Sequence, residues 1–82
     1  MNQTYHFRVQ LHQTETSSPV LLEWLQTLTG MIITIDSFKP RSIWQPLRTG
    51  TCDLSIHSSR DEAIVFYNLV QQHHPIDALQ TL

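Results

Sequence analysis

The stretch TCDLSIHSSRDEAIVFYNLV, residues 51–70, decides the fold because a strand is followed directly by a capped helix. Residues 52–57 alternate apolar and polar side chains, and this period of two predicts a strand with one buried face. Ser59 and Glu62 then form an S-x-x-E capping box, which marks the start of a helix. The apolar residues that follow recur with helical spacing: Ala63, Phe66, Tyr67 and Val70. A half-buried strand and an amphipathic helix that need a common core are typical of an α+β domain.

The residues upstream predict two more strands and another helix. Residues 5–11 alternate like residues 52–57, and the β-branched run MIITIDSF, residues 31–38, predicts the second strand. Between them, Ser18 as N-cap and Pro19 at the first helical position predict a helix that Gly30 ends in a left-handed conformation. The apolar stripe of this helix comprises Leu21, Trp24, Leu25 and Leu28.

The order β-α-β-β-α predicts a single α+β domain over residues 1–82. Two helices packed on one face of a three- or four-stranded antiparallel sheet would bury both apolar stripes. The last segment, PIDALQTL at residues 75–82, fits either a short edge strand or a last helical turn. This order resembles the ferredoxin-like βαββαβ superfold, or a variant of it truncated before the last strand. A superfold hosts many unrelated functions, so the resemblance implies none of them.

Composition limits the classes of function and the location. The formal net charge of −2 argues against general attraction to nucleic acid or anionic membranes. Cys52 is the single cysteine, so no internal disulfide is expected and a reducing compartment is favoured. The amino terminus does not resemble a signal peptide, and no apolar run approaches the roughly 20 residues of a membrane span. We therefore expect a cytoplasmic protein without a membrane segment.

Motifs for catalysis or cofactor binding are not found in the sequence. Cys52 and His57 have odd spacing along one strand, so they lie on opposite faces, and Cys52 is interpreted as a small buried apolar residue. The chain has only two glycines, Gly30 and Gly50, which argues against a glycine-rich phosphate loop. We therefore predict a protein that is not an enzyme and that uses no cofactor.

The histidines are candidate metal ligands. If Val9 pairs with Leu54, His6 faces His57 across the strands and Asp53 lies further away, but a site needs three or four ligands. Solvated side chains on an open sheet face are the favoured interpretation. This face comprises His6, Arg8, Gln10, His12, Asp53, Ser55 and His57. His73 and His74 point about 100° apart at a helix end, so they cannot chelate as a simple pair. A cation at that end favours the helix dipole, and we predict no metal site.

The segment FKPRSIWQPLRTG, residues 38–50, is the candidate binding surface. It contains three of the five Lys and Arg residues of the chain, and no acidic residue. The residues predicted to contact a partner are Lys39, Arg41, Ile43, Trp44, Leu47 and Arg48. Trp and Arg are enriched at binding hot spots, although the apolar members of this set could instead fold back and cap the core.

We predict a non-catalytic module that binds another protein through residues 38–50, as a small regulator, inhibitor or accessory subunit. The alternative is a module for single-stranded nucleic acid that uses the same segment and the open sheet face, with Trp44 stacking on a base. A homodimer is also expected if residues 75–82 do not form a strand, because residues 5–11 would then be an exposed sheet edge.

Overall fold

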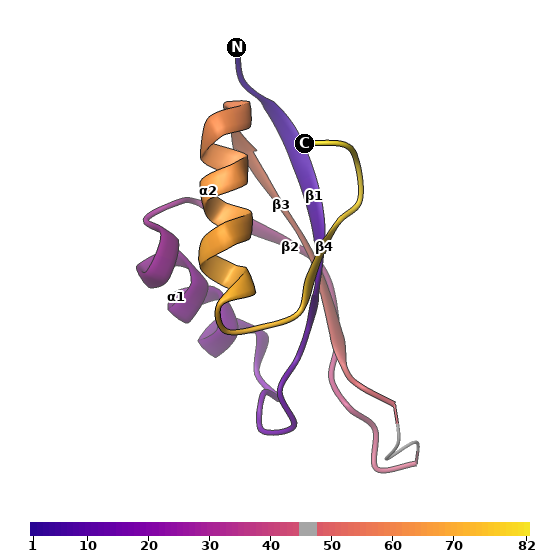
Figure 1. Ribbon diagram of the computed structural model, residues 1–82. Helices are drawn as coiled ribbons and strands as arrows, with labels where there is room; N and C mark the ends of the chain where they lie inside the picture. The colour runs from indigo at the N-terminus through magenta and orange to yellow at the C-terminus, as the bar shows by residue number, and fades with distance from the viewer. Residues whose placement is uncertain (45–47) are drawn as a thin grey trace.

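Figure 1 shows the computed structural model of the protein, which describes residues 1–44 and 48–82. The described elements are, in chain order, β1 (Gln3–Gln10), α1 (Ser18–Thr29), β2 (Ile33–Lys39), β3 (Thr51–Ser58), α2 (Arg60–Gln71) and β4 (Ile76–Ala78). The strands of this described part form a four-stranded antiparallel sheet in the order β2-β3-β1-β4. Both helices lie on one face of the sheet (Figure 1). The prediction of an α+β domain with two helices on an antiparallel sheet is confirmed.

The core lies between the sheet and the helices, and the local patterns of the sequence explain it. Phe7 on β1 and Phe66 on α2 are fully buried, with ring centroids 5.1 Å apart. The predicted capping box is present, because the Ser59 hydroxyl accepts a hydrogen bond from the backbone N–H of Glu62. Helix α1 begins at Ser18, one residue earlier than predicted, and has Ser17 as its N-cap. No helix in the described ranges is long and apolar enough to cross a membrane.

The pairing of β1 with β3 corrects the register assumed from the sequence. Val9 lies opposite Cys52, not Leu54, so the assumed register is wrong by two residues. An even shift keeps each side chain on its face, and the predicted buried and open faces are therefore unaffected. It does separate the two histidines, because His6 faces Ser55 and His57 faces Thr4. The period of two specifies a face of a strand but leaves its partner residue undetermined.

The ambiguous carboxyl-terminal segment contains a strand. β4 pairs with β1 over Phe7–Val9, and Ile76 is buried in the core. Beyond β4, the side-chain amide of Gln80 continues the pairing along β1: it accepts a hydrogen bond from the His6 N–H and donates one to the Thr4 carbonyl, both at 3.1 Å. The strand whose exposed edge suggested a homodimer is therefore paired on both sides over these residues.

Candidate functional site

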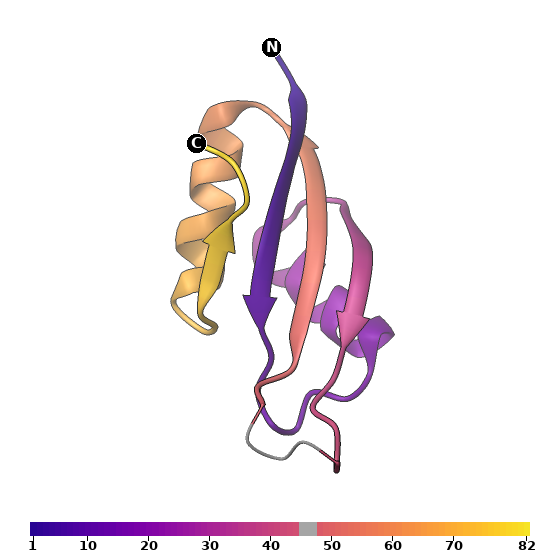
Figure 2. The ribbon, with the colours of Figure 1, turned by 90° about the vertical axis from the view of Figure 1, so that its right-hand side faces the viewer.

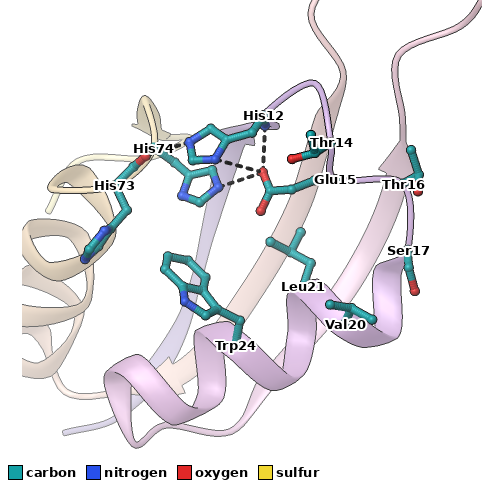
Figure 3. A pocket seen from close by; sticks show the side chains of 10 residues that line it. All are labelled: His12, Thr14, Glu15, Thr16, Ser17, Val20, Leu21, Trp24, His73 and His74. Carbon is teal, nitrogen blue, oxygen red and sulfur yellow. Dashed lines mark hydrogen bonds and ion pairs between the residues drawn. The ribbon is translucent and has the colours of Figure 1, made fainter.

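A pocket lies beside α1, where the loop from β1 to α1 meets the turn between α2 and β4. Figure 3 shows the side chains that line it, and its volume is about 580 Å³. The lining residues are His12, Thr14, Glu15, Thr16, Ser17, Val20, Leu21, Trp24, His73 and His74. The pocket is built from three separate segments, so its shape depends on the packing of the whole domain.

Glu15 is the centre of the polar group in this pocket. Its Oε1 accepts a hydrogen bond from the backbone N–H of His12 at 2.6 Å and one from Nε2 of His74 at 2.7 Å. The Nδ1 atom of His12 lies 3.7 Å from the same oxygen. The rings of His12 and His74 stack with centroids 3.9 Å apart and planes 4° from parallel. Two imidazoles therefore lie side by side against a single carboxylate, as Figure 3 shows.

The hydrogen bonds define which nitrogen of each ring carries the proton. Nε2 of His12 lies 2.8 Å from the backbone oxygen of His73, which can only accept, so Nε2 must donate. In the neutral ring, Nδ1 of His12 then presents its lone pair towards Glu15. Nε2 of His74 donates to the carboxylate, and its Nδ1 is buried without a hydrogen-bond partner in the described part of the chain. His74 is only 2% exposed.

Trp24 forms the apolar wall of the pocket. The sequence placed it in the core stripe of α1, but its side chain is 37% exposed at the margin of the core. Its ring packs edge-on against His73 at a centroid distance of 5.3 Å and tilted against His74 at 5.1 Å. An indole beside two imidazoles and a carboxylate suits a cation or a small ligand with N–H donors.

The arrangement shows no activated nucleophile. The hydrogen bonds that the described residues make to the rings of His12 and His74 involve only Glu15 and the His73 carbonyl. A hydroxyl or thiol would have to bond an imidazole to be activated by it. The two rings are thus held by a carboxylate and a backbone carbonyl.

This site was not predicted from the sequence. His12 was placed on the open sheet face, but β1 ends at Gln10 and the His12 side chain turns into the pocket. Glu15 and Trp24 were not considered as site residues, and His74 was assigned to the helix end. One available signal was that His12 follows the first strand and His74 precedes the last one. In an antiparallel pair, the end of the first strand lies beside the start of the last one. This signal can be used only if residues 76–78 are predicted to form a strand.

The other residues predicted for the open sheet face do not converge on one site. Arg8 and Asp53 form a bidentate ion pair at 2.8 and 3.2 Å, and the hydrogen bond from Arg8 lowers the pKa of the Asp53 carboxyl. His6 lies 3.5 Å from Asp36 on β2, and His57 contacts the Thr4 hydroxyl. The other two members of the set are Gln10, which is exposed, and Ser55, which is buried.

Residues 38–50, which we call the arm, comprise the last two residues of β2 and the connection to β3. The parts of the arm that the structure describes, up to residue 44 and from residue 48, extend beyond the end of the sheet (Figure 2). Trp44 is 86% exposed and Ile43 is 84% exposed, so neither caps the core. Leu47, which was predicted to contact a partner, lies outside the described residues. Lys39, Arg41 and Arg48 belong to none of the ion pairs found among the described residues.

The base of the arm is tightly packed around Gly50. A Cβ atom at this position would lie 2.7 Å from the backbone N of Arg41 and 2.9 Å from the backbone O of Lys39. The Gly50 carbonyl accepts a hydrogen bond of 2.8 Å from the backbone N–H of Leu11. Glycine is therefore required where the two legs of the arm approach each other.

Comparisons with protein-family models, with curated proteins and with solved structures found no match to this chain. The geometry of the pocket and of the arm is therefore the basis for assigning a function.

Proposed function

We propose that this domain is a non-catalytic module that binds another protein through the arm, as a small regulator, inhibitor or accessory subunit. The observation that supports this most is the exposure of Trp44, at 86%, next to Ile43, at 84%. Burial of apolar surface stabilises an association by roughly 25 cal/mol per Å², before the costs of binding are subtracted. These two side chains contribute little to the core of their own domain, and a partner could bury both.

The charge of the arm indicates the chemistry of the partner. Lys39, Arg41 and Arg48 flank Ile43 and Trp44 in the sequence, and the segment contains no acidic residue. A complementary surface is an apolar pocket with Asp or Glu residues at its rim. Rim charges of this kind mainly increase the association rate and select the partner, and the buried aromatic supplies most of the affinity.

The base of the arm supports the proposal because backbone contacts within the domain hold its two legs together. Lys39 pairs with Thr51 in the sheet, and the close approach at Gly50 holds the two legs together. The backbone N–H of Trp44 donates to the Ser42 hydroxyl at 3.1 Å. Segments that are held in place lose less conformational entropy on binding.

Two further assignments accompany this proposal. We infer a ferredoxin-like arrangement, which the strand order β2-β3-β1-β4 and the placement of both helices on one face support. We also propose a cytoplasmic location, which the single, buried free cysteine supports.

The test is to isolate a partner with the immobilised protein and then to measure its affinity for purified variants. We expect Trp44→Ala to raise the dissociation constant more than about tenfold, which corresponds to a loss of about 1.4 kcal/mol of binding free energy. Added salt should reduce the association rate, since rim cations steer the encounter. Ile32→Ala is the matched control, because Ile32 is also highly exposed but lies between α1 and β2, outside the arm.

Equal affinities for wild type and Trp44→Ala would contradict the proposal. A parallel titration with a labelled mixed-sequence single-stranded oligonucleotide examines the alternative. Tight binding that falls steeply with salt and is lost in Trp44→Ala would assign the arm to nucleic acid instead. The open sheet face offers little support for that outcome, because Arg8 is already paired with Asp53 and the predicted face residues include no aromatic ring other than histidine.

A further inference from the structure

We propose that His12, Glu15 and His74 bind a divalent transition-metal ion, for which Zn²⁺ is the representative. This site is separate from the arm and does not depend on the proposed function. Each residue offers one ligand atom, and these atoms all lie within 4.8 Å of one another. His12 and Glu15 come from the loop after β1, and His74 comes from the turn before β4. The metal would therefore join two segments that are far apart in the sequence.

The distances between the ligand atoms need to change little for metal binding, although the two stacked rings have to tilt towards a common ion. Zn²⁺ binds nitrogen and carboxylate oxygen at about 2.0–2.2 Å in a tetrahedral arrangement, so its ligand atoms lie about 3.3 Å apart. Oε1 of Glu15 lies 2.7 Å from Nε2 of His74 and 3.7 Å from Nδ1 of His12. The distance from Glu15 to His74 has to lengthen and the distance from Glu15 to His12 has to shorten, each by about half an ångström.

The His12 ring is oriented as metal-binding imidazoles are. Its Nε2–H donates to the His73 carbonyl at 2.8 Å, and an outer hydrogen bond of this kind holds the ring and directs the other nitrogen to the metal. The lone pair of Nδ1 then faces Oε1 of Glu15 at 3.7 Å, which is too long for a hydrogen bond. Two acceptors that face each other repel, and a cation between them would turn the repulsion into attraction.

The His74 ring limits the affinity. Binding through Nε2 displaces its hydrogen bond to Glu15 and moves the ring proton to Nδ1. That nitrogen is buried and has no acceptor in the ranges that the structure describes. A buried N–H without a partner costs free energy, so we expect binding in the micromolar range and not tighter.

The ligand set also selects the metal. Two imidazoles and one carboxylate suit Zn²⁺ and its transition-metal neighbours, whereas Mg²⁺ and Ca²⁺ prefer oxygen ligands alone. Three protein ligands leave a fourth position, which water or a small ligand can occupy from the pocket.

The test is isothermal titration calorimetry of the tag-free protein with ZnCl₂. We expect one equivalent of Zn²⁺ to bind with micromolar affinity, and His12→Gln and Glu15→Gln to weaken it more than about tenfold. Glu15→Gln keeps one oxygen that can accept from the His12 N–H, but it removes the charge and replaces the other oxygen with an NH2 group. The matched controls are His57→Gln, at an exposed histidine of β3, and His73→Gln, in the same pocket but outside the proposed ligand set.

Circular dichroism of each variant establishes that it is folded, and the buried His74 is left unchanged for that reason. Thermal melts supply a second measurement: Zn²⁺ should raise the melting temperature of wild type and of His57→Gln, and MgCl₂ should not. The proposal is overturned if wild type binds no Zn²⁺, if folded His12→Gln and Glu15→Gln bind as tightly as wild type, or if His57→Gln abolishes binding.

Discussion

Cys52 illustrates how the position of one residue determines its chemistry. Its side chain is fully buried in β3, and burial, followed by the charges of Asp53, Asp36 and Glu15, raises the pKa of its thiol from 9.0 to about 11. The thiolate is the reactive form. We therefore expect iodoacetamide to modify Cys52 very slowly in the folded protein at about pH 8, and rapidly once urea unfolds it.

The same shift predicts how stability depends on pH. An unfolded chain ionises this thiol near pH 9.0, whereas the folded protein retains the proton until about pH 11. The stabilising contribution is complete below the lower value and is lost as the pH rises to the upper one.

Mass spectrometry of the alkylated protein measures the reaction of Cys52 with iodoacetamide, and rapid, complete modification of the folded protein would show that Cys52 is accessible.

At the scale of elements, Gly50 connects the arm to the sheet. In Gly50→Ala, the new Cβ would clash with the backbone of Arg41 and Lys39, and the two legs of the arm would have to separate. We expect the free energy of unfolding to fall by about 1–3 kcal/mol, as it does for other overpacked sites. Urea denaturation measures this change.

Thr49→Ala is the control for Gly50→Ala. Thr49 is exposed and adjacent in sequence, so its substitution should change the free energy of unfolding by less than about 0.5 kcal/mol. If Gly50→Ala proves as stable as Thr49→Ala, the base of the arm is looser than the close backbone contacts indicate.

At the scale of the whole molecule, the strand order places β1 inside the sheet. Its outer edge is covered by β4 over Phe7–Val9 and by the Gln80 amide further along. Deletion of residues 76–82 would uncover this edge and remove Ile76 from the core, at a cost of about 2–5 kcal/mol for the side chain alone. We expect lower stability and self-association that increases with protein concentration, because an unpaired strand edge binds other strands.

Sedimentation velocity at several concentrations and urea denaturation measure the two effects of this deletion. Asp77→Ala is the control, because Asp77 is an exposed residue of β4 whose backbone pairs with Arg8. It should leave the oligomeric state unchanged. A truncated protein with the stability and the sedimentation of the full chain would show that β4 is dispensable.

The sequence by itself determined the elements from β1 to α2 and the buried faces of β1 and β3. Alternation in β1 and β3, the capping box at Ser59 and the left-handed Gly30 all act between neighbours in the chain, so their signals are local. The arm could also be singled out from sequence, because its cations and its tryptophan lie within a few residues of each other.

Only the tertiary structure decided the register of β1 against β3, the strand at residues 76–78 and the pocket. Glu15 and His74 are 59 positions apart, and no local pattern relates them. Their contact depends on β4 pairing with β1, which in turn depends on the burial of Ile76 in the common core. Contacts between distant segments form only when the core has brought those segments together, and the site of His12, Glu15 and His74 is such a contact.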